Sequence, residues 1–212
     1  MTIHMLALAA LIRHCAPAVA PSTMTAIVRV ESGGNPFAVG DNTTRRSYYP
    51  RDRATAERLV HRLLDAGHLL DVGIAQIDSM NFAGFGVTAH TIFDPCTNLS
   101  VGARILSGDY AFAVRRYGDG QVALRHAIGM YNTGRLDAGQ SYVRRVLLAA
   151  GIQERHWMRR PTVVPNDAGQ SGLLARLPIT DKKPLSTRHR AMAPSRAPIL
   201  ITIARASGVT LF

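Results

Sequence analysis

The stretch from residue 22 to residue 36, STMTAIVRVESGGNP, places a single carboxylate between an apolar run and two glycines. Ser22 or Thr23 can cap a helix whose apolar residues continue to about Glu31. Gly33 and Gly34 then end the helix, because glycine is favoured just beyond a helix C-terminus. The pattern therefore predicts that Glu31 lies in the last turn of a helix.

A carboxylate in this position has two interpretations. The negative end of the helix dipole and the apolar neighbours both disfavour its charged form, so they raise the pKa of Glu31. A raised pKa keeps a carboxyl group protonated near neutral pH, as a general acid requires, and the two glycines would let a polymer pass close to the backbone. The alternative is an ordinary solvated residue at a helix end, which this stretch alone favours.

Outward from this stretch, most of the chain shows helical spacing of apolar residues. The spacing predicts helices over residues 3–14, 22–31, 52–66, 97–117, 119–132 and 141–150, the third capped by Asp52 and stopped by Gly67. Two intervening segments, 37–50 and 68–78, have room for a small hairpin. We therefore expect a mainly α domain.

Composition and charge divide the chain into a globular part and a tail. Hydrophobic residues make up 47% and charged residues 18% of the 212 residues, which supports a packed core and excludes global disorder. From 158 to 212, nine Lys and Arg face two Asp and Glu, a net charge of +7, against +4 for residues 1–157. We expect an N-terminal helix or weak leader over 1–14, one domain over 15–157, and a disordered Pro/Arg-rich tail over 158–212.

The basic charge suits an acidic partner such as nucleic acid, anionic lipid or an anionic envelope polymer. No recognition motif for nucleic acid accompanies it, so specific nucleic-acid binding is not expected. No apolar run approaches the roughly 20 residues of a transmembrane helix, and Met5–Ile12 is short for a leader. Cys15 and Cys96 lack zinc-ligand spacing, so no metal or cofactor is expected, and they are either two thiols or one disulfide.

Three short motifs, read in order, resemble those of the lysozyme-like lytic transglycosylases. They are ESGGNPFAVGDN, DVGIAQIDS and AIGMYNTG, and the segments CAPAVAPSTMTAIVRVESGGNP and IFDPCTNLSVGARIL accompany them. The closest resemblance is to the small members encoded with type IV secretion and conjugation systems, and it covers about residues 15–157. It implies the mostly helical α+β lysozyme-like fold, with two lobes around a glycan groove.

The resemblance also implies a reaction and a place for it. The substrate would be the β-1,4 bond between N-acetylmuramic acid and N-acetylglucosamine in peptidoglycan. Glu31 would protonate the glycosidic oxygen and then take the proton of the muramic acid C6 hydroxyl, giving a 1,6-anhydro sugar. The protein would act in the periplasm or cell envelope, opening the wall locally for a secretion apparatus, and its C-terminal tail would dock components of that apparatus.

Several further residues match motif positions of the family. Ser32 would hydrogen-bond Glu31 or the sugar, although it also fits an ordinary turn serine. Tyr131 would touch Glu31 or the substrate's N-acetyl group, although a core aromatic at a helix end is common. The implied substrate-binding set is Ser32, Gly73, Gln76, Tyr131 and Asn132. The resemblance also favours a Cys15–Cys96 disulfide.

Two alternatives remain open at this stage. Asp71 stands where animal-type lysozymes have a second carboxylate, and near Glu31 it would make the protein a hydrolase that uses water; Asp41 is a weaker candidate for the same part. Ala75 departs from the family, which often has Met there. The protein could also be a non-catalytic envelope assembly protein that docks through its basic tail.

Overall fold

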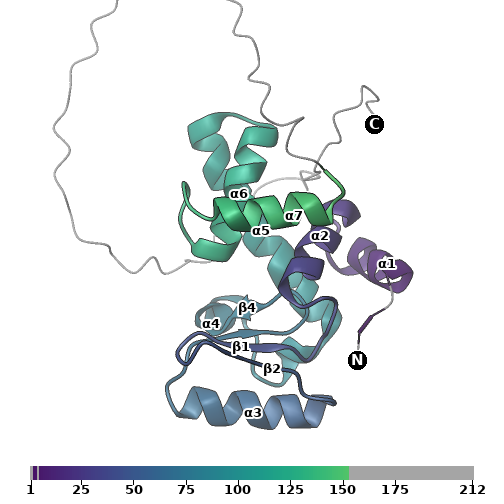
Figure 1. The fold of residues 1–212 in the computed structure, drawn as a ribbon, viewed down its shortest axis with the longest axis vertical. Helices are drawn as coiled ribbons and strands as arrows, with labels where there is room; N and C mark the ends of the chain where they lie inside the picture. The colour runs from purple at the N-terminus through teal and green to yellow at the C-terminus, as the bar shows by residue number, and fades with distance from the viewer. Residues whose placement is uncertain (1, 4, 153–212) are drawn as a thin grey trace, which may run out of the picture.

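The computed structural model describes residues 2, 3 and 5–152, which form helices around a small sheet (Figure 1). The α-helices are α1 Met5–Cys15, α2 Pro21–Glu31, α3 Arg53–Asp65, α4 Phe82–Phe85, α5 Pro95–Tyr117, α6 Gln121–Thr133 and α7 Gln140–Ala149. The strands are β1 Val39–Asp41, β2 Arg46–Tyr48, β3 Leu70–Val72 and β4 Ile77–Asp78, and two 3-10 helices are η1 Ser79–Asn81 and η2 Thr91–Phe93.

This architecture confirms the predicted fold class, a mainly helical α+β domain. Both candidate hairpins form, and they join in one antiparallel sheet of order β2-β1-β3-β4. The glycan groove stays a prediction. The tail predicted over 158–212 lies outside the described residues.

Local sequence accounts for where the helices begin. Asp52 accepts a 2.7 Å hydrogen bond from the Thr55 N–H and caps α3 as predicted. The prediction that Ser22 or Thr23 caps α2 is wrong, because α2 already begins at Pro21. Proline suits the first position of a helix, where its missing N–H leaves no bond unmade.

The sheet separates α3 from the larger group of helices (Figure 1). One sheet face is buried: Val39, Leu70, Val72 and Ile77 lie on it together with Asp41, and Ala56 and Val60 of α3 are buried as well. Because side chains alternate along a strand, Gly40, Asp71 and Asp78 belong to the other face, where the register pairs Asp71 with both of the others. That face is partly exposed and polar.

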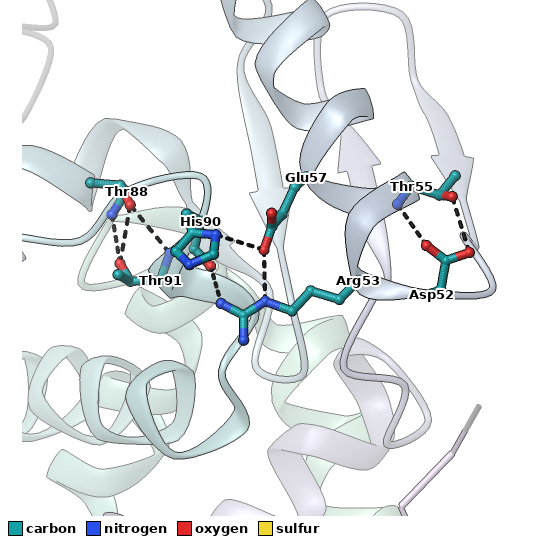
Figure 2. Close-up of polar contacts among 7 residues, drawn as sticks. All are labelled: Asp52, Arg53, Thr55, Glu57, Thr88, His90 and Thr91. Atoms are coloured by element: carbon teal, nitrogen blue, oxygen red, sulfur yellow. Dashed lines mark hydrogen bonds and ion pairs between the residues drawn. The ribbon is translucent and has the colours of Figure 1, made fainter.

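A polar cluster of Arg53, Glu57 and His90 links α3 to the start of η2 (Figure 2). Glu57 accepts a 2.6 Å bond from Arg53 Nε and lies 3.0 Å from Nδ1 of His90. Arg53 also donates from Nη2 to the His90 carbonyl at 2.8 Å. The cluster therefore links two segments that are distant in the sequence.

The first helix is packed into the domain rather than appended to it. Leu8 and Ile12 of α1 are fully buried in the core. At its end, Cys15 forms a disulfide with Cys96 in the first turn of α5, with 5.1 Å between the Cα atoms. This is the pairing that the resemblance implies. Over the described part of the chain, no helix has the length and apolar character needed to cross a membrane.

Candidate active site

Glu31 is the last residue of α2, as the sequence predicts, and its side chain is partly buried. Tyr142 of α7 donates a 2.5 Å hydrogen bond to its Oε1. Burial, with help from the nearby charge of Asp71, raises the pKa of Glu31 to about 7, against the opposing effects of Tyr142 and Arg145. A carboxyl group with this pKa exchanges its proton near neutral pH.

The turn after Glu31 is held against the sheet by Ser32. The Ser32 hydroxyl donates to the Ile74 carbonyl at 2.7 Å and accepts from the Gly34 N–H at 3.1 Å. Both of these bonds position the backbone around Glu31, whereas the sequence suggested a bond to Glu31 itself or to the sugar. Ser32 therefore joins the end of α2 to the loop between β3 and β4.

The two glycines of this turn have different surroundings. Both have positive φ, 61° at Gly33 and 85° at Gly34. A Cβ at Gly33 would meet nothing within 4 Å, whereas one at Gly34 would lie 3.2 Å from Cγ2 of Thr2. The Gly34 carbonyl also accepts from the Ile3 N–H at 3.0 Å. The expectation that a polymer passes both glycines is therefore wrong for Gly34, which the N-terminal segment covers.

Gly73 opens the loop between β3 and β4 and is approached closely by Asn98 of α5. A Cβ at Gly73 would lie 2.2 Å from Nδ2 of Asn98. The buried Asn98 side chain donates to the carbonyls of Val72 and Ile92, at 2.9 and 3.0 Å, and accepts from the Ala75 N–H at 2.8 Å. Gly73 therefore leaves room for Asn98, and the substrate contact that the resemblance implies for Gly73 stays a prediction.

Gln76 ends the same loop in a left-handed conformation, with φ of 48°. Its Nε2 donates to the carbonyls of Ala38 and Gly73, at 3.0 and 2.8 Å. Its Oε1 lies 3.3 Å from where a Cβ on Gly40 would stand, which places it on the polar face of the sheet. Non-glycine residues at positive φ are uncommon, and such strain is frequent at functional sites.

Tyr131 and Asn132 occupy the last turn of α6. The Tyr131 phenol donates to the Ala75 carbonyl at 2.7 Å, so it secures the same loop. Burial first, and then the charge of Glu31, raise the pKa of Tyr131 well above its usual range, so Tyr131 is a neutral donor. Asn132 is exposed.

Tyr142 is the site residue that sequence reasoning missed. It is buried, and burial followed by the charge of Glu31 raises the pKa of its phenol well above the usual range. The Arg145 guanidinium carbon lies 5.5 Å from the centre of its ring. The resemblance implied that Tyr131 touches Glu31 or the substrate's N-acetyl group. In the structure the phenol of Tyr131 bonds the Ala75 carbonyl, and the phenol that bonds Glu31 belongs to Tyr142. In the sequence, a tyrosine on an amphipathic helix is expected to be a core residue, so no local pattern indicates that Tyr142 belongs to the site.

Asp71 brings a second carboxyl group to the site from β3. Asn42 donates from Nδ2 to its Oδ2 at 2.9 Å. Burial raises the pKa of Asp71 to about 6, the Asn42 bond opposes this rise, and the charge of Asp78 adds to it. Asp71 is one of the charges that act on Glu31, so the structure brings both carboxyl groups into one electrostatic site.

Asp41, the weaker candidate, belongs to the hairpin instead. It is buried, and its oxygens accept from the Thr44 hydroxyl at 2.6 Å and from backbone N–H groups of Thr43 and Thr44. Burial would raise its pKa, but the bonds from Thr44 and His68 lower the pKa of Asp41 to about 2. Among the described residues, no three His, Cys, Asp or Glu side chains gather in a way that could hold a metal ion.

Comparisons with known proteins identify the family to which the chain is similar. The transglycosylase SLT domain family matches residues 10–145. Protein virB1 of Agrobacterium fabrum is 46% identical over 140 residues, 65% of this chain and 57% of that protein. Type IV secretion system protein virB1 of Brucella suis is 39% identical over 150 residues, 67% of this chain and 63% of that protein. The match therefore spans less than two thirds of either relative. No solved structure matches the chain significantly.

Proposed function

Because this chain belongs to the transglycosylase SLT domain family, we propose that it is a peptidoglycan lytic transglycosylase with Glu31 as its acid and base. The observation that carries the proposal is the environment of Glu31: it is partly buried, hydrogen-bonded by Tyr142, and its pKa is about 7. The substrate bond is the β-1,4 link from N-acetylmuramic acid to N-acetylglucosamine.

In the first step, protonated Glu31 gives its proton to the glycosidic oxygen as the bond to the anomeric carbon breaks. N-acetylglucosamine leaves with a free 4-hydroxyl group, and positive charge develops on the muramic acid ring. Burial supports this step because it keeps Glu31 protonated at a pH where an exposed glutamate would be ionised.

In the second step, the C6 hydroxyl of the same muramic acid attacks the anomeric carbon. Its proton passes to the Glu31 carboxylate, which returns to its starting state, and the product is a 1,6-anhydro sugar. No water is consumed, so the two steps need one protein carboxyl group. The substrate's own N-acetyl group can stabilise the positive charge between the steps.

The other motif residues support the reaction in two ways. Ser32 and Tyr131 hold the loop between β3 and β4 beside Glu31, and Gly73 leaves room for Asn98 next to that loop. Gln76 and Asn132 are the members proposed to contact the glycan, because Oε1 of Gln76 lies on the polar sheet face and Asn132 is exposed. We place Tyr142 with Glu31, as the donor that orients the carboxyl group.

We propose that the protein acts on peptidoglycan in the periplasm or cell envelope, where it opens the wall for a type IV secretion or conjugation apparatus. The relatives named as virB1 support this setting, as does the disulfide, since such bonds persist in oxidising compartments. Docking of secretion components by the basic tail is part of the same proposal.

A second candidate activity is hydrolysis, because Asp71 shares the site with Glu31. As a second carboxylate it could activate a water molecule, and the product would then have a reducing end. The two activities use the same acid and differ in the nucleophile.

The test is mass spectrometry of the soluble products that purified sacculi release. Wild-type protein should release muropeptides with 1,6-anhydro ends, and Glu31→Gln should release none. Glu57→Gln is the matched control, because Glu57 lies in the cluster between α3 and η2 and should retain activity. Reducing ends would establish the hydrolase. Absence of products from correctly folded wild-type protein would contradict both activities and favour an assembly protein.

A further inference from the structure

Asn42 lies in the turn of the β1–β2 hairpin, beside the carboxyl group of Asp71. It directly follows β1, and its N–H donates to the Leu69 carbonyl at 2.9 Å, which extends the pairing of the sheet. Its side chain is exposed, yet Nδ2 donates to Oδ2 of Asp71 at 2.9 Å. The exposed amide of Asn42 is thus bound to a partly buried carboxylate, which suggests that it controls the position of that carboxylate.

Hydrogen bonds of the neighbouring residues Asp41 and Thr43 fix the backbone around Asn42. Asp41, the residue before Asn42, is buried. Its carboxylate accepts hydrogen bonds from the backbone N–H groups of Thr43 and Thr44 and from Nδ1 of His68, the last at 2.8 Å. Thr43 accepts from the Leu69 N–H at 2.9 Å. The hairpin therefore presents the Asn42 amide to Asp71 from a rigid base.

The groups around Asp71 otherwise disfavour its negative charge. Asp78, the register partner of Asp71 on β4, disfavours this charge, and the charge of Asp71 in turn acts on Glu31 of α2. Burial acts in the same direction, and the Asn42 amide opposes both. An amide N–H bonded to a carboxylate stabilises the ionised form and fixes its orientation.

We propose that Asn42 is a positioning residue that holds the Asp71 carboxylate beside Glu31, facing the sugar at which the glycosidic bond breaks. The inference rests on the proposed function. A fixed negative charge near the anomeric carbon stabilises the positive charge that develops there. Asp71 would thus act through its charge, and Asn42 would determine where that charge lies.

The test follows Asp71 directly, by carbon-13 NMR titration of its carboxyl group in the full chain. Asn42→Ala removes a bond that lowers the pKa of Asp71, so this pKa should rise above about 6. The kcat for release of muropeptides should fall by roughly tenfold with little change in KM, because the lost interaction belongs to the transition state. His61→Ala is the control: His61 is exposed on α3, away from the polar face of the sheet, and its loss should change neither value.

An unchanged Asp71 titration in a folded Asn42→Ala variant would overturn the inference, as would an unchanged kcat. The NMR measurement does not depend on activity. A wild-type protein that releases no anhydro product would therefore contradict the proposed function, while the titration alone decides whether Asn42 controls the charge of Asp71.

Discussion

At the scale of single residues, Glu31 experiences opposing effects that leave its pKa near neutrality. Burial and Asp71 favour the protonated form, whereas Tyr142 and Arg145 favour the carboxylate. An acid that must give and then take a proton works best when its pKa lies near the working pH. The pKa of Glu31 therefore depends on the balance between these groups and not on any one of them.

Removal of one hydroxyl group tests this balance. Tyr142→Phe deletes a bond that lowers the pKa of Glu31, so the pKa should rise above about 7. The alkaline limb of the pH profile of kcat/KM should then move to higher pH. Tyr110→Phe, which removes a phenol bonded to Asp119, is the control and should leave the profile in place. An unmoved limb in Tyr142→Phe would contradict the assigned role.

A second buried acid, Asp109 of α5, should affect stability rather than catalysis. It is buried, its Oδ2 has no hydrogen-bond partner among the described residues, and burial raises the pKa of Asp109 to about 8. The folded state therefore keeps a proton that the unfolded state releases above about pH 4. The free energy of unfolding should fall as pH rises through this window, by up to about 1.4 kcal/mol per pH unit.

Asp109→Asn removes the titrating carboxyl group and should make the free energy of unfolding depend less on pH. Urea unfolding from about pH 5 to about pH 8 should show a flatter dependence than wild type, with the variant relatively most stable at the alkaline end. Parallel curves for the two proteins would show that Asp109 is ionised in both states.

At the scale of elements, the site depends on how the loop between β3 and β4 is held. Ser32 just after α2, Asn98 of α5 and Tyr131 of α6 each bond a backbone group of residues 72–75. This loop is the point at which the helices and the sheet meet. Its shape therefore positions the two carboxyl groups relative to each other.

Gly73→Ala tests that dependence. The substitution combines a left-handed backbone, φ of 85°, with a clash against Asn98, and should lower the free energy of unfolding by roughly 2–4 kcal/mol. Gly67→Ala shares the positive φ, 79°, but meets nothing within 4 Å, so it should cost only about 1 kcal/mol. Equal losses in urea unfolding would mean that Asn98 yields to the new methyl group.

Sequence reasoning predicted the long elements better than the contacts between them. The helices were found because apolar spacing and the Asp52 cap are local signals. Strands of two or three residues carry no measurable alternation, so the two hairpins could be suggested but not joined into a sheet. Glu31 and Tyr142 are 111 residues apart, and only packing of α2 against α7 brings them together.

At the scale of the whole molecule, the Cys15–Cys96 disulfide closes a loop of 81 residues between α1 and α5. Reduction should lower the free energy of unfolding by roughly 2–4 kcal/mol, because the unfolded chain regains the freedom that the bond removes. Urea unfolding with and without dithiothreitol measures the loss. The double variant Cys15→Ala, Cys96→Ala should be insensitive to the reductant, and an unchanged wild-type midpoint after full reduction would refute the prediction.

The central claim is that the muramic acid C6 hydroxyl, and not water, attacks the anomeric carbon while Glu31 handles the proton. The most direct measurement is digestion of sacculi in water enriched in oxygen-18, followed by mass spectrometry of the released muropeptides. We predict 1,6-anhydro products that contain no oxygen-18. Products with one oxygen-18 atom at a new reducing end would contradict the claim, since water would then be the nucleophile.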